Sequence, residues 1–146
     1  MRLVCVLTLL SVLAACSSSG TPASSSDAGA TDEPFVAPTP LTSAVSAGGL
    51  RLDVRTDPQP PPRGTFNVLL DVTNASGAPV DGLTIDAVPW MTAMGHGSSV
   101  RTAITPQGNG RYSITDVGMF MPGDWELRLT FTGSVSDHAA PIIPVP

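Results

Sequence analysis

The chain has 146 residues and a formal net charge of −5 at pH 7, and its basic residues are seven dispersed arginines with no lysine. It therefore lacks the basic cluster that is typical of nucleic-acid-binding proteins, and its acidic balance disfavours docking onto anionic lipid headgroups. The length that remains after the N-terminal segments is enough for one small domain.

The N-terminus has the pattern of a secretory signal. Arg2 precedes an apolar run over residues 3–12, which is shorter than the roughly 20 residues that span a bilayer. The run ends in Leu-Ala-Ala-Cys at residues 13–16, which resembles the bacterial lipoprotein box, in which the cysteine is lipidated. We expect residues 1–15 to be a lipoprotein signal peptide and Cys16 to be the membrane anchor. The alternative is a plain signal peptide that is cleaved after small residues.

The position of this signal defines the compartment and the thiol content. Cys5 would be removed with the signal and Cys16 would carry lipid, so the mature domain has no thiol and no disulfide. Ser17 follows the cysteine, and in lipoproteins serine at this position favours the outer membrane over the inner. We expect the protein in the bacterial cell envelope, on the periplasmic face of the outer membrane.

Residues 16–45 are expected to be a flexible tether that follows the anchor. They are rich in Ser, Ala, Thr, Pro and Gly, and they show no apolar periodicity. Such a composition cannot bury enough apolar surface to fold, so the segment is expected to be disordered.

Residues 46–146 show the period-two alternation of half-buried β-strands almost throughout. Turn residues such as Gly, Asn, Asp and Pro separate the alternating runs. The sequence therefore predicts an all-β domain, an immunoglobulin-like sandwich of about seven antiparallel strands. The expected strands lie at or near residues 50–55, 66–72, 83–87, 100–105, 112–115, 125–131 and 141–145.

Apart from the initiator, every methionine lies in one of two short segments between these strands. The first contains Met91, Met94 and His96, with glycines on both sides of the histidine, and the second contains Met119 and Met121. Thioethers and neutral imidazole are soft or borderline ligands, which suit Cu(I) better than Mg²⁺ or Ca²⁺. The alternative is that the methionines fill the core and the histidine is an ordinary loop residue.

The order of the strands brings the two segments together. If each strand reverses the direction of the one before, both methionine segments lie at the same end of the sandwich. We therefore predict a metal site with Met91, Met94 and His96 as first-choice ligands and Met119 and Met121 as the second pair. Of these, Met119 is the candidate most suited to packing, because it lies deeper in its strand.

Five motifs in the domain resemble, in order, the YtkA-like domain family over about residues 50–131. They are Phe-x-Val-x-Leu from residue 66, Gly-Ala-Pro-Val-Asp-Gly-Leu from 77, Pro-Trp-Met-x-x-Met-Gly-His-Gly from 89, Gly-Arg-Tyr from 110 and Met-Pro-Gly-Asp-Trp-Glu-Leu from 121. The chain is more distantly similar to FixH-type proteins of cytochrome oxidase assembly and to CopC-type copper carriers. The resemblance implies a β-sandwich and copper handling. Family members often have proline where this chain has Thr92.

Two functions are consistent with these observations. The first is a tethered protein that binds Cu(I) and buffers it or delivers it to a copper protein, an oxidase or a transporter. The second is a metal-free interaction module that docks an envelope partner protein through exposed Met and Trp side chains. We expect no enzymatic activity, because the candidate site has one His, no Cys and no Ser-His-Asp set.

Overall fold

A computed structural model describes residues 39–146 of the chain. The expected signal peptide, Cys16 and most of the expected tether lie outside the described residues. Among residues 39–146, no helix is both long and apolar enough to cross a membrane.

The described residues form an all-β domain of ten strands and one short 3-10 turn. These are β1 (Thr42–Val45), β2 (Arg51–Asp57), β3 (Gly64–Thr73), β4 (Leu83–Met91), η1 (Thr92–Met94), β5 (His96–Gly97), β6 (Ala103–Gly108), β7 (Arg111–Met119), β8 (Gly123–Gly133), β9 (Asp137–Ala139) and β10 (Ile142–Val145).

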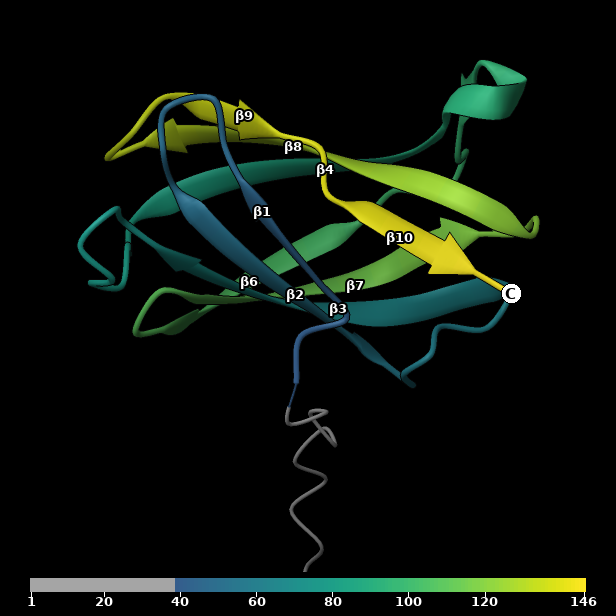
Figure 1. Cartoon of the computed structure of the whole chain (residues 1–146), viewed down its shortest axis with the longest axis horizontal. Coiled ribbons are helices and arrows are strands. Elements are labelled where there is room, and N and C mark those ends of the chain that lie inside the picture. The colour runs from purple at the N-terminus through teal and green to yellow at the C-terminus, as the bar shows by residue number, and fades with distance from the viewer. Residues whose placement is uncertain (1–38) are drawn as a thin grey trace, which may run out of the picture. The chain divides into compact units, whose positions relative to one another are not determined.

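The strands form two antiparallel sheets of five strands each. Sheet A has the order β1-β2-β3-β7-β6, and sheet B has the order β10-β8-β4-β5, with β9 paired to β8 beside β10. Figure 1 shows the two sheets as the layers of a sandwich. The prediction of an all-β sandwich is therefore confirmed, whereas its immunoglobulin-like detail stays a prediction.

The core lies between the two sheets and consists of the inward-facing residues of each alternating strand. In β8, for example, Trp125, Leu127 and Leu129 are buried while Arg128 between them is exposed. Period-two alternation produces this result because successive side chains of a strand point to opposite faces. Every strand and every buried apolar residue of this core lies between residues 41 and 145. We therefore expect the described segment to fold on its own.

The structure differs from the sequence prediction in the number and the limits of the strands. The β1 strand lies before residue 46, the expected start of the domain, and pairs with β2. Its four residues carry no bulky apolar alternation, so the pattern that marks the other strands is weak there. The strand expected at residues 100–105 is shifted to β6 (Ala103–Gly108), because residues 98–102 instead connect sheet B to sheet A.

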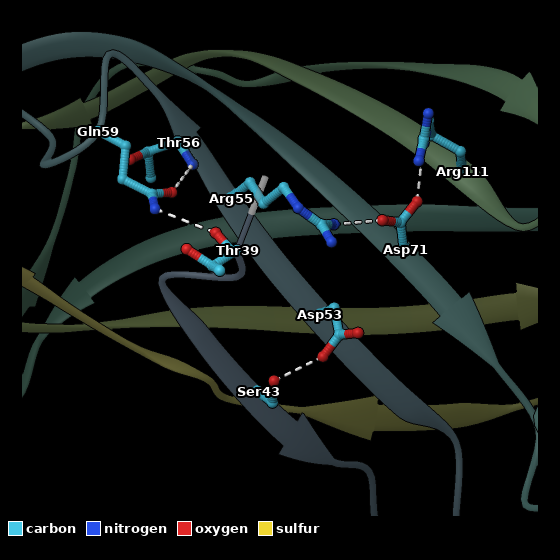
Figure 2. Close-up of polar contacts among 8 residues, drawn as sticks. All are labelled: Thr39, Ser43, Asp53, Arg55, Thr56, Gln59, Asp71 and Arg111. Carbon is cyan, nitrogen blue, oxygen red and sulfur yellow. Dashed lines mark hydrogen bonds and ion pairs between the residues drawn. The ribbon is translucent and has the colours of Figure 1, made fainter. Parts of the chain in front are cut away.

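The outer face of sheet A is polar, as the alternation requires. Asp71 on β3 lies between two guanidinium groups, and it pairs with Arg55 on β2 and with Arg111 on β7 (Figure 2). The Ser43 hydroxyl on β1 donates a hydrogen bond of 2.5 Å to Asp53 (Figure 2). Hydrogen bonding and attraction to Asp71 raise the pKa of Arg111 above its ordinary value. These pairs connect neighbouring strands across a solvated face.

Candidate metal centre

The first methionine segment is the tight hairpin between β4 and β5. Met91 ends β4, the η1 turn carries Met94, and His96 begins β5. Met91 and His96 are opposite each other in the β4–β5 register, so they share one face of the sheet. The Gly95 N–H donates to the Met91 carbonyl at 2.9 Å and closes the turn. Gly95 has φ 69°, a left-handed conformation that glycine adopts without strain.

Trp90 holds the other side of this hairpin. Its partner in the register is Gly97, where an added Cβ would lie 3.2 Å from the Trp90 ring atom Cε3. The absence of a side chain at Gly97 thus lets the indole lie against β5. On sheet B the Arg128 guanidinium stacks over the Trp90 ring, 4.2 Å from its centroid, in a cation–π contact.

A short polar network fixes the η1 turn to β8. The Thr92 hydroxyl donates a hydrogen bond of 2.7 Å to Glu126 Oε1, and Arg128 Nε donates one of 2.8 Å to Glu126 Oε2. The bonds from Thr92 and then Arg128 hold the pKa of Glu126 below its ordinary value. Because Arg128 also stacks on Trp90, one network positions both sides of the hairpin.

The second methionine segment lies at the same end of the sandwich. Met119 ends β7, and β8 starts at Gly123 after a three-residue connection. An added Cβ at Gly123 would lie 3.1 Å from the Met91 methyl carbon, so the start of β8 lies against that thioether. Trp125 Nε1 donates a hydrogen bond of 2.9 Å to the Met121 carbonyl and fixes the connection. We call this end, formed by residues 91–97 and 119–123, the Met end.

The structure separates the five predicted ligands by burial. Met119 is fully buried at 0% exposure and Met91 is 7% exposed, so both are part of the core. Met121 is partly buried against the core, and Met94 is 59% exposed on the η1 turn. His96 is exposed, and its Nδ1 lies 3.2 Å from the Gly97 carbonyl.

These positions define which donors could reach one ion. Donation from Nδ1–H to the Gly97 carbonyl leaves the lone pair of His96 on Nε2, where a metal can bind it. Met94 lies on the η1 turn two residues before His96, and Met91 is opposite His96 in the β4–β5 register. Among residues 39–146, no three His, Cys, Asp or Glu side chains cluster as a metal site.

Sequence reasoning missed the network that positions the turn. Alternation along β8 places Glu126 and Arg128 on the outer face, and alternation along β4 does the same for Trp90. Their contacts depend on the β4–β8 register, in which Trp90 is opposite Glu126 and Val88 is opposite Arg128. The alternating pattern alone contains no information about that register.

No curated protein and no solved structure matches the chain. A family model described as YtkA-like matches residues 47–130, which is more than half of the chain and includes both methionine segments. The chain therefore belongs to the YtkA-like family.

Proposed function

We propose that this protein binds Cu(I) at the Met end and buffers or delivers it in the cell envelope. The observation that supports the proposal best is the pairing of Met91 with His96 across a hairpin whose turn carries Met94. Met121 is the fourth candidate, since its segment adjoins the Met91 methyl through Gly123. Met119 is assigned to packing, because it has no exposed surface.

The donor chemistry favours Cu(I) over other ions. Thioethers and a neutral imidazole add no negative charge, so they suit a soft monovalent ion better than Cu(II), which prefers imidazole and carboxylate. Zinc is disfavoured, because thioethers contribute little to sites that prefer Cys, His and carboxylate. A partly exposed site suits transfer, since the Met94 side chain is accessible to an acceptor protein.

The test is a competition titration of residues 39–146 with a Cu(I)-selective chromophore under reductant. We expect Met94→Leu and His96→Ala to weaken Cu(I) binding at least tenfold. Met119→Leu serves as the matched control, since it removes a thioether at the same end and should leave the affinity unchanged. Leucine has a similar volume to methionine, so the Leu variants should lose less than about 1.5 kcal/mol of stability. A wild type that does not compete for Cu(I) would contradict the proposal.

A second candidate function is supported by the apolar surface of the same end. Met94 is 59% exposed and Phe120 is 52% exposed, and exposed Met and aromatic side chains are enriched in protein interfaces. In this function the Met end docks an envelope partner, such as an oxidase subunit or a transporter, without metal. Phe120→Ser would then abolish partner capture, whereas under the copper proposal it leaves the Cu(I) affinity unchanged.

The membrane anchor is part of the proposal. Lipid on Cys16 would keep the domain at the membrane surface, as the lipoprotein pattern at residues 13–16 implies. Two or more acyl chains on one cysteine give a stable attachment.

A further inference from the structure

The β4 strand has a free edge along most of its length. One side of Leu83–Met91 pairs with β8, but on the other side β5 pairs only with Trp90 and Met91. The remaining part of that edge, residues 83–88, has no neighbouring strand among the described residues. Such edges present unpaired backbone N–H and C=O groups that can pair with another chain.

The hydrogen bonds at this edge show which groups face outward. The Thr102 hydroxyl donates a hydrogen bond of 2.8 Å to the Ala87 carbonyl, and the Ser98 N–H donates one of 2.9 Å to the Pro89 carbonyl. The Leu83 N–H donates a hydrogen bond of 3.2 Å to the Tyr112 hydroxyl. All three β4 residues are odd-numbered, so by antiparallel alternation the even-numbered residues bond to β8 and the odd-numbered ones face the free edge.

Four outward-facing groups in a row are left without a hydrogen bond among residues 39–146. They are the Leu83 carbonyl, the Ile85 N–H, the Ile85 carbonyl and the Ala87 N–H. This set is symmetric about Ile85, with one acceptor before it and one donor after it. Two further outward-facing groups already have hydrogen bonds within the chain, the Leu83 N–H with the Tyr112 hydroxyl and the Ala87 carbonyl with the Thr102 hydroxyl. These two groups also lie at equal distances in sequence on either side of Ile85.

We propose that two copies of this protein associate through β4, antiparallel about a two-fold axis at Ile85. In this register the Ile85 N–H of each copy donates to the Ile85 carbonyl of the other. The Ala87 N–H of each copy donates to the Leu83 carbonyl of the other. All four unpaired groups of each copy are thereby satisfied, and the two B sheets become one continuous sheet.

The side chains of β4 are compatible with this self-pairing. Thr84 of one copy is opposite Asp86 of the other, a hydroxyl–carboxylate pair that occurs twice by symmetry, and both side chains are exposed. A groove of about 390 Å³ has residues 86–89 of β4 on one side and residues 98–102 on the other. In the proposed register Gly82 of the second copy lies at this groove, and as a glycine it adds no side chain that the groove would have to hold.

Three of the other edge strands, β5, β6 and β10, are less suited to such pairing than β4. Edge strand β6 contains Pro106, edge strand β10 contains Pro144, and β5 has only two residues. Proline removes a backbone donor and is one of the devices by which edge strands avoid association. In β4 the only proline is Pro89, which lies beyond the unpaired groups.

The dimer keeps the two Met ends apart. Met91 is six residues from Ile85 on each copy. At about 3.3 Å per residue the two Met91 residues are roughly 40 Å from each other on opposite sides of the axis. Each Met end is therefore formed within one chain, and the dimer proposal does not depend on metal binding.

The test is sedimentation equilibrium of residues 39–146 with variants at Thr84. We expect a reversible dimer, which Thr84→Asp weakens about tenfold because it places like charges opposite each other twice. Thr84→Lys should keep or tighten the dimer, since lysine would face Asp86 of the second copy. Thr105→Asp on the β6 edge is the matched control and should leave association unchanged.

Backbone amide exchange provides an independent measurement. The Ile85 and Ala87 amides should exchange more slowly at concentrations where the dimer forms than at dilution. Equal thermal unfolding of the variants shows that they remain folded. A monomer at several hundred micromolar, a dimer that responds equally to Thr84→Asp and Thr84→Lys, or Ile85 exchange that is independent of concentration would each overturn the proposal.

Discussion

The Asp137 carboxylate accepts a hydrogen bond from the Ser46 hydroxyl, although 91 positions separate the two residues. The same carboxylate accepts from the backbone N–H groups of Gly48 at 2.8 Å and His138 at 2.7 Å. Ser46 lies in the turn between β1 and β2, and Asp137 begins β9. The bond therefore connects sheet A to sheet B at a site where both polar side chains are buried.

This relationship predicts a pH-dependent contribution to stability. Burial by itself raises the pKa of Asp137, but the hydrogen bonds from Ser46, His138 and Gly48 outweigh it and hold the pKa below its ordinary value. The contribution is therefore complete above the unfolded-state pKa of about 4 and is lost as the pH falls through the lowered value. Asp137→Asn should cost about 1–3 kcal/mol at neutral pH.

The measurement for Asp137 is urea unfolding between pH 2 and pH 7. The wild type should lose stability on acidification more steeply than Asp137→Asn. Asp116→Asn is the matched control, because Asp116 is an exposed residue of β7 without such a network. Equal slopes for wild type and Asp137→Asn would show that the buried carboxylate is not the source.

A second prediction concerns Thr56, whose buried hydroxyl has no hydrogen-bond partner among residues 39–146. Thr56→Val replaces this hydroxyl with a methyl group of similar shape on the core face of β2. We expect the free energy of unfolding to rise by about 1 kcal/mol, because a buried polar group without a partner is removed. Thr65→Val on the exposed face of β3 should change it by less than about 0.5 kcal/mol. Destabilisation by Thr56→Val would contradict this account.

The third prediction tests the network that holds the η1 turn. Thr92→Val and Glu126→Gln each weaken the Thr92–Glu126 hydrogen bond, so the turn should open more often. Amide exchange at Gly95, whose N–H bonds to the Met91 carbonyl, should accelerate several-fold in both variants. Thr132→Val, on β8 but distant from the turn, is the control. If Gly95 exchange does not change, the network does not position the turn.

The fourth prediction concerns the anchor. Cys16→Ser should release the protein from the membrane fraction, because serine cannot carry the thioether-linked lipid. Cys5→Ser should leave the protein membrane-bound, since residue 5 lies in the expected signal peptide. A Cys16→Ser protein that still sediments with membranes after a salt wash would contradict the lipoprotein prediction.

The fold was predictable from sequence to the extent that one face of each strand is buried. Alternation such as Trp125, Leu127 and Leu129 identifies both the strand and its inner face. The short strands β1, β5 and β9 were not identified, because β1 carries no bulky apolar alternation and β5 and β9 have only two and three residues. They are defined by pairing with a longer neighbour, which is a property of the assembled sheet.

The location of the methionine segments was also predictable, and so was the packing position of Met119, but the burial of Met91 and the exposure of Met94 were not. Strand order alone placed both segments at one end, and the contact between Gly123 and the Met91 methyl confirms this placement. Whether a methionine at a strand end faces the core depends on the sheet opposite, so Met91 at 7% exposure and Met94 at 59% could not be distinguished by residue type. The metal itself stays a prediction.

The first described residue, Thr39, lies at the same end of the sandwich as the Met end. The Gln59 side-chain amide donates to the Thr39 carbonyl at 3.1 Å, just after the end of β2 (Figure 2). The β2 strand ends beside the start of β3, where Gly64 is opposite Met119. If Cys16 carries lipid, as we propose, the chain that follows it would therefore join the domain at the end where the candidate copper ligands lie.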